Sequence, residues 1–179
     1  MKKTALKPKS SRGYLMIELI IAISLLTVGL LGFLQLLYRS VSLNQVIADQ
    51  FTANYLAMEG VEVVKNLIDA VYVRSLSTLE PWNTGFATEA CYEVDMETSD
   101  INAAPVVNCS TLSNTPLNYD SSFYTYGPGT ETPFYRTVHI TPIGTDEIKV
   151  NSTVTWRGRG GVNYKIDLED HFFNWRPAP

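Results

Sequence analysis

Glu18 occupies the chemically most unusual position in this sequence, because it is the one charged side chain within a long apolar segment. Residues 14–37 read YLMIELIIAISLLTVGLLGFLQLL and contain no other Asp, Glu, Lys or Arg. A carboxylate inside a bilayer costs about 3 kcal/mol on insertion scales, so such residues are usually functional and pair with a cation. Two interpretations follow. Glu18 either lies near the helix start and reaches the headgroups, or binds a cationic group brought by another chain.

Cys91 and Cys109 are the two cysteines of the chain. Outside the cytoplasm, a disulfide is the expected state of such a pair. It would close a loop of about 18 residues and stabilise the fold by roughly 3 kcal/mol in the chain-entropy model. A catalytic thiol would need a histidine partner, and neither His139 nor His171 is near a cysteine in the sequence. The pair is therefore predicted to form a structural disulfide.

Three acidic residues, Asp95, Glu97 and Asp100, are weak candidates for Ca²⁺ ligands. In an acidic chain such spacing arises easily by chance, and a solvated loop is the preferred interpretation, so no metal and no cofactor is predicted. Two Cys and two His leave little room for a multi-ligand zinc site. The sequence lacks Gly-x-Ser-x-Gly, His-Glu-x-x-His and phosphate-loop motifs, and no enzyme is predicted.

The apolar segment around Glu18 has the length of a membrane span. Its 24 residues make a helix of about 36 Å, enough to cross a hydrocarbon core of about 30 Å. Residues 1–13 precede it with five Lys and Arg and no acidic residue, and form a predicted basic leader. We expect a transmembrane helix over residues 14–38, with the N-terminus in the cytoplasm and the rest of the chain outside, by the positive-inside rule.

Residues 39–78 are predicted to continue this helix as an amphipathic segment. No proline occurs between Pro8 and Pro81, and one helix from about Tyr14 to about Ser77 is expected. Apolar residues recur every three or four positions, and this stripe is predicted to pack onto the following domain. The stripe consists of Ile47, Phe51, Tyr55, Met58, Val61, Val64, Ile68 and Val71.

Residues 79–179 are predicted to form a loop-rich β-sheet domain. Residues 105–133 are rich in Pro, Gly, Ser, Thr and Asn and read as a long loop. Residues 134–141, 148–156 and 162–168 alternate between apolar and polar and predict antiparallel strands. The aromatic tail at residues 171–175 is expected to dock on the sheet edge. The predicted fold class is α+β, a long N-terminal helix packed on a small C-terminal antiparallel sheet.

The sequence GYLMIE at residues 13–18, behind a basic leader and before an unbroken apolar helix, resembles the prepilin-type cleavage and methylation motif of type IV pilins and type II secretion pseudopilins. The resemblance implies that prepilin peptidase cuts after Gly13 and methylates Tyr14, where phenylalanine is usual. Glu18 then becomes the fifth residue. The glycine turn after Trp156 and the closing Asn174-Trp175-Arg176 look similar to minor-pilin C-termini.

This resemblance implies a filament subunit that sits in the inner membrane before assembly. Its partners would be prepilin peptidase, other pilin or pseudopilin subunits, the inner-membrane assembly platform and membrane lipid. The Glu18 carboxylate would neutralise the new amine of a neighbouring subunit and fix the stagger between chains. A monomeric, single-pass, membrane-anchored binding domain is the alternative and requires no cleavage. DNA is not predicted as a partner, because the chain beyond residue 13 carries an excess of acidic residues.

Overall fold

The structure is a computed structural model that describes residues 12–78, 80–158 and 161–175. Most of the predicted basic leader, residues 1–11, lies outside the described residues, as does Arg159 of the predicted glycine turn. The chain divides into two compact units, residues 1–45 and residues 46–179.

The first unit consists of the first part of helix α1, which runs from Arg12 to Thr78. All residues from 14 to 45 are exposed, including the long apolar run. The most apolar 18-residue window of the helix has a mean hydropathy of 2.4, and none of it is buried. The prediction of one continuous helix is confirmed, and its N-terminal part is long and apolar enough to span a membrane.

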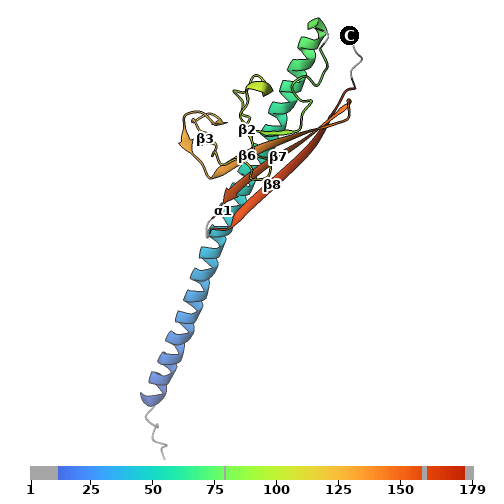
Figure 1. Cartoon of the computed structure of the whole chain (residues 1–179). Coiled ribbons are helices and arrows are strands. Elements are labelled where there is room, and N and C mark those ends of the chain that lie inside the picture. The colour runs from blue at the N-terminus through green and yellow to red at the C-terminus, as the bar shows by residue number, and fades with distance from the viewer. Residues whose placement is uncertain (1–11, 79, 159–160, 176–179) are drawn as a thin grey trace, which may run out of the picture. The chain divides into compact units, whose positions relative to one another are not determined.

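The second unit contains a five-stranded antiparallel sheet in the order β2-β1-β6-β7-β8 (Figure 1). Three long strands are joined by hairpins, and the β6–β7 turn places Gly144 at a φ of +64°, which favours glycine. A separate three-stranded sheet has the order β4-β3-β5. The strands are β1 (Ala90–Tyr92), β2 (Val106–Val107), β3 (Asn118–Tyr119), β4 (Tyr124–Thr125), β5 (Thr130–Glu131), β6 (Phe134–Ile143), β7 (Glu147–Arg157) and β8 (Asn163–Phe173).

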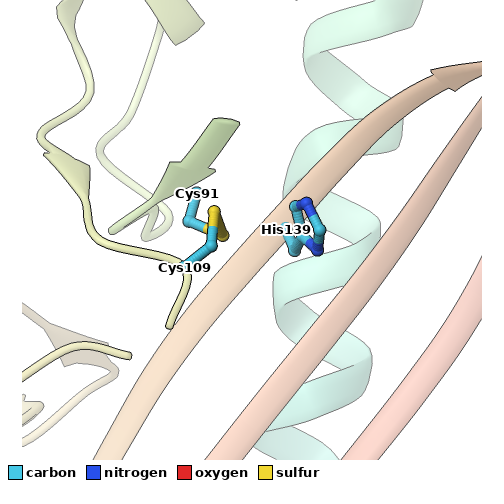
Figure 2. Close-up of side chains that lie close together, drawn as sticks. All are labelled: Cys91, Cys109 and His139. Carbon is cyan, nitrogen blue, oxygen red and sulfur yellow. A yellow bond between two sulfur atoms is a disulfide. The ribbon is translucent and has the colours of Figure 1, made fainter. Parts of the chain in front are cut away.

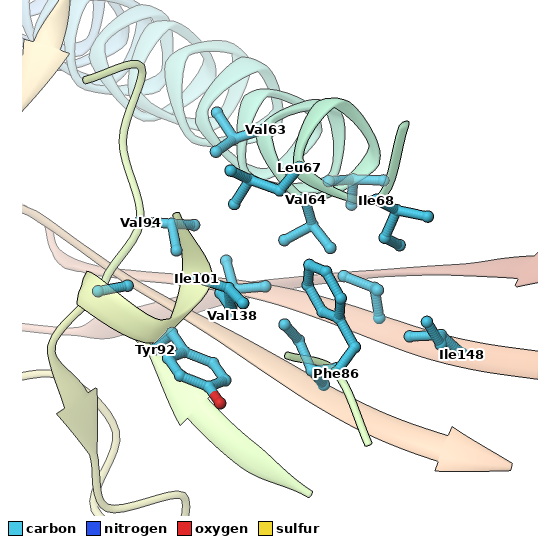
Figure 3. Close-up of a cluster of buried hydrophobic side chains, with 14 of the residues drawn as sticks. Val63, Val64, Leu67, Ile68, Phe86, Tyr92, Val94, Ile101, Val138 and Ile148 are labelled. Atoms are coloured by element: carbon cyan, nitrogen blue, oxygen red, sulfur yellow. The ribbon is translucent and has the colours of Figure 1, made fainter. Parts of the chain in front are cut away.

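The core of this unit lies between the second half of α1 and one face of the large sheet (Figure 3). Val64 of the helix and Val138 and Ile148 of the sheet are fully buried in it. Phe86, from the connection between α1 and β1, and Ile101, from the connection between β1 and β2, complete the same cluster. The predicted α+β architecture, a helix packed on an antiparallel sheet, is therefore confirmed.

The predicted helix stripe is wrong in its first half. Ile47, Phe51, Tyr55 and Met58 are exposed, with Phe51 at 62% and Tyr55 at 69%. The series takes seven steps over 24 residues, so its average step is shorter than the 3.6 residues of a helical turn. The direction in which these side chains point therefore rotates by about a third of a turn from Ile47 to Val71. Only its second half therefore faces the core. The sheet instead packs on the helix face formed by Ala53, Leu56, Ala57, Gly60 and Val61.

The strand predictions hold for β6 and β7, whose apolar residues alternate into the core as expected. In contrast, Val162 precedes β8 and is exposed. The aromatic tail does not dock on the sheet edge, because His171–Phe173 are themselves the end of the edge strand, and Trp175 is 76% exposed. The sheet extends this far because β7 pairs with β8 along its whole length, up to Glu147 opposite Phe173.

The segment predicted as a long loop contains four short strands. Side chains of its polar residues organise the backbone between them. Asp120 Oδ1, for example, accepts hydrogen bonds from the backbone N–H groups of Ser122 and Phe123. Such local bonds let a segment rich in Ser, Thr and Asn adopt a fixed conformation without an apolar pattern.

Candidate functional site

The processing and assembly motif lies at the start of α1. Gly13 is in the first turn of this helix, and Tyr14 and Glu18 follow one turn apart on the same face. Ile17, Ile21 and Leu25 share that side of the helix with them. Both the Tyr14 and the Glu18 side chain are exposed. The motif therefore lies on an accessible, apolar side of the helix that carries one carboxylate.

Glu18 makes no hydrogen bond or ion pair to any residue that the structure describes. The residues that flank it in the sequence, Met16, Ile17, Leu19 and Ile20, offer no side-chain donor. Ser24 and Thr27, the next polar residues, bond backbone carbonyls of their own helix instead. A lone carboxylate in an apolar surface is unfavourable in lipid and lacks a cation within the described chain.

The disulfide between Cys91 and Cys109 is present, as predicted (Figure 2). It joins β1 to the segment that follows β2, with a Cα–Cα distance of 5.3 Å. Cys91 is buried, whereas Cys109 is exposed. The bond therefore ties β1, the second strand of the large sheet, to the loop that follows the edge strand β2.

His139 lies beside this disulfide, although the distance in sequence gave no reason to expect it (Figure 2). The antiparallel register of β1 and β6 places Cys91 directly opposite His139. A ring nitrogen of His139 and the two sulfur atoms lie within 4.8 Å of one another. Nε2 of the same ring is 2.9 Å from Oε1 of Glu89. Only the pairing of β1, a strand that the sequence did not predict, brings these groups together.

The acidic candidates for Ca²⁺ do not converge on one point. Asp95 is buried, and its carboxylate accepts hydrogen bonds from Thr98 Oγ1, Thr125 Oγ1 and the backbone N–H groups of Glu97 and Tyr126. Burial raises the pKa of Asp95, but these bonds outweigh it and hold the pKa below its usual value. Asp100 instead caps the short 3₁₀ helix Ile101–Ala103 through a bond from Asn102 N–H.

A buried ion pair between sheet and helix was not anticipated from the sequence. Arg136 is 0% exposed, and its guanidinium donates to Glu59 Oε1 at 3.1 Å and to the carbonyl oxygens of Leu56 and Val94. The strand alternation placed this arginine on the inward face, between Phe134 and Val138, which is the pattern that could have revealed it. The pair fixes the position of the helix on the sheet.

No protein-family model, curated protein or solved structure matches this chain. A proposal about its function must therefore rest on the residue pattern at the start of α1 and on the fold.

Proposed function

We propose that this protein is a subunit of a type IV pilus or type II secretion pseudopilus filament, of the minor pilin type. Prepilin peptidase would cut after Gly13 and methylate Tyr14, and the mature chain would assemble through its apolar helix. The observation that carries this proposal is the Glu18 carboxylate, which has no partner among the described residues and follows Gly13 and Tyr14 at the start of an exposed apolar helix.

Assembly would resolve the two unfavourable features of this helix. Its apolar side chains require either lipid or other helices around them, and its carboxylate requires a cation. Cleavage after Gly13 creates a positively charged amine on Tyr14 of each subunit. A neighbouring subunit displaced along the filament can present Glu18 to that amine. Because leucine and isoleucine pack without specifying register, this ion pair would fix the stagger between subunits.

The apolar residues that do not face the sheet provide further support. Phe51, Tyr55 and Met58 lie on the exposed side of α1 within the second unit, with their side chains in solvent. A monomeric soluble surface rarely exposes several large apolar residues on one helix face, and such patches usually mark interaction sites. In a filament this face would pack against neighbouring subunits.

The same proposal gives the protein its location and partners. The subunit would wait in the inner membrane with its N-terminus in the cytoplasm, where the peptidase acts, and its sheet domain outside. The Cys91–Cys109 disulfide fits an oxidising compartment on that side. The assembly platform of the inner membrane, membrane lipid and other pilin subunits would be its partners.

Glu18→Val tests the proposal. We expect the variant to insert into the membrane and to have its leader removed normally, but to be recovered from sheared filaments at least tenfold less than the wild type. The loss follows because the amine of the neighbouring subunit would have no counter-ion in an apolar surrounding. Recovery is measured by immunoblotting of sheared filaments against the membrane fraction.

Glu62→Ala is the matched control, since Glu62 is an exposed acid of the same helix that pairs with the exposed Lys65. It should enter filaments at the wild-type level. Normal recovery of Glu18→Val would refute the assigned role of Glu18.

A further inference from the structure

Cys91, Cys109 and His139 form a cluster of three metal-ligand side chains on the second unit (Figure 2). Among the residues that the structure describes, no other group of three or more His, Cys, Asp or Glu side chains converges in this way. In the disulfide, neither sulfur is a thiolate, and thiolate is the form that binds metals. The cluster therefore cannot hold an ion while the disulfide is intact.

We propose that reduction of this disulfide creates a binding site for a thiophilic divalent cation such as Zn²⁺. The ligands would be the two thiolates and one imidazole nitrogen, with water in the fourth position. A tetrahedral ion holds its ligand atoms roughly 3.5–4 Å apart, given bond lengths of about 2.3 Å to sulfur and 2.0 Å to nitrogen. The three donor atoms already lie within 4.8 Å of one another, so small side-chain movements complete the site.

The sheet holds two of these ligands in place independently of the disulfide. Cys91 and His139 are directly paired residues of β1 and β6, and β6 pairs over its full length with β7. Glu89 lies 2.9 Å from Nε2 of His139 and orients the ring, so that Nδ1 would be the ligand nitrogen. A carboxylate bound to a histidine ligand is the usual outer-sphere arrangement of zinc sites, because it fixes the ring and increases its basicity.

The chemistry balances with an external dithiol as reductant. The dithiol attacks the exposed Cys109 sulfur, the S–S bond breaks, and the dithiol closes to a cyclic disulfide as both cysteines become thiols. Binding of one divalent cation then releases the two thiol protons to solvent and forms two metal–sulfur bonds. Cys109 is the accessible sulfur for this exchange, since Cys91 is buried.

Co²⁺ titration of the full-length protein in detergent tests the proposal. The disulfide is first reduced with a phosphine. The phosphine takes the oxygen atom of a water molecule and becomes a phosphine oxide, and the two protons of that water go to the cysteines. This reductant leaves no thiol that could compete for the metal. We expect the reduced protein to bind one Co²⁺ per chain with thiolate-to-cobalt charge-transfer absorption and tetrahedral d–d bands. The oxidised protein should show neither.

His139→Ala should weaken Co²⁺ binding by about tenfold or more, whereas His171→Ala, which removes the other histidine, should leave it unchanged. Circular dichroism on each reduced sample reports whether the sheet is retained. The proposal is overturned if reduced wild type binds Co²⁺ no better than Cys91→Ser/Cys109→Ser, if His139→Ala binds as wild type does, or if reduction unfolds the sheet.

Discussion

Arg136 shows how a single charge can determine where a helix lies on a sheet. Its guanidinium is fully buried, so its desolvation must be offset by good partners. Glu59 provides the opposite charge, while Leu56 and Val94 provide carbonyl acceptors at 3.0 and 2.5 Å. These partners come from two different segments, and the terminal nitrogens of the guanidinium reach all three of them only when the helix is in this position, while Nε stays without a hydrogen-bond partner among the described residues. The pair therefore specifies the packing more than it stabilises it.

Removal of the Glu59 carboxylate should destabilise the sheet unit strongly. Glu59→Ala leaves the buried Arg136 charge with carbonyl partners alone, and we expect a loss of about 3 kcal/mol in the free energy of unfolding. Glu62→Ala, on the exposed face of the same helix, should change it by less than about 0.5 kcal/mol. Chemical denaturation of both variants measures the difference. Equal stability of the two variants would argue against a structural role for the pair.

Gly60 is required by the close approach of helix and sheet. A Cβ atom there would lie 2.5 Å from Ser152 Oγ, 3.1 Å from Arg136 Cδ and 3.2 Å from Val138 Cγ2. Glycine-to-alanine substitution normally stabilises a helix interior by up to about 1 kcal/mol. Gly60→Ala should instead lower the stability by about 1–3 kcal/mol through overpacking.

Gly32→Ala is the comparison for this change, because a Cβ at Gly32 meets nothing within 4 Å. It should leave the thermal unfolding of the sheet unit unaltered. A Gly60→Ala variant that melts at or above the wild-type temperature would show that the helix can move away from Ser152 without cost.

The sequence identified the residues whose chemistry depends on local context. Glu18 stands out within its apolar run, and a disulfide is the default state of two cysteines outside the cytoplasm. The neighbours of Cys91 and Arg136 could not be predicted in this way. His139 and Glu59 reach them through strand register and helix docking, which join residues far apart in sequence.

At the scale of elements, β8 is the exposed edge of the large sheet and is protected by charge. Lys165, Asp167, Glu169 and His171 alternate along one face of this strand, a common means of preventing edge-to-edge association. His171 also bridges β8 to its neighbour. Its Nδ1 is 2.5 Å from Glu147 Oε1 on β7, and its Nε2 is 3.2 Å from Glu169 Oε1.

This bridge predicts a pH-dependent stability. Hydrogen bonds to Glu147 and Glu169 raise the pKa of His171 above its usual 6.5, and bonds from Asn151 and His171 lower the pKa of Glu169 below its usual 4.5. The His171 contribution is complete below pH 6.5 and disappears as pH rises through its folded pKa. The Glu169 contribution is complete above pH 4.5 and disappears as pH falls. His171→Gln should therefore lower the melting temperature at about pH 6 but much less at about pH 9. A pH-independent difference would contradict this bridge.

The elements were predictable to different extents. The long helix follows from a proline-free sequence, and β6 and β7 follow from their alternation. The core-facing side of the helix did not follow, because α1 carries large apolar residues on the opposite side as well, and small residues such as Ala53 and Ala57 face the sheet. The short strand β1 has only three residues, too few for a periodic pattern.

At the scale of the whole molecule, the chain combines two units with opposite solvent requirements. Residues 14–45 expose an apolar surface that is unfavourable in water, whereas the sheet unit has an apolar core between the sheet and the second half of α1. A protein built in this way needs a membrane or other copies of its helix around the first unit. Both are available to a filament subunit that is stored in a membrane and then assembled.

The mass of the mature protein, determined with N-terminal sequencing on purified filaments or membranes, tests the central claim most directly. We predict a chain that starts at Tyr14, carries a single methyl group on that amine and lacks the first thirteen residues. Gly13→Leu should remain uncut and stay out of filaments. A functional protein that keeps residues 1–13 would contradict the account.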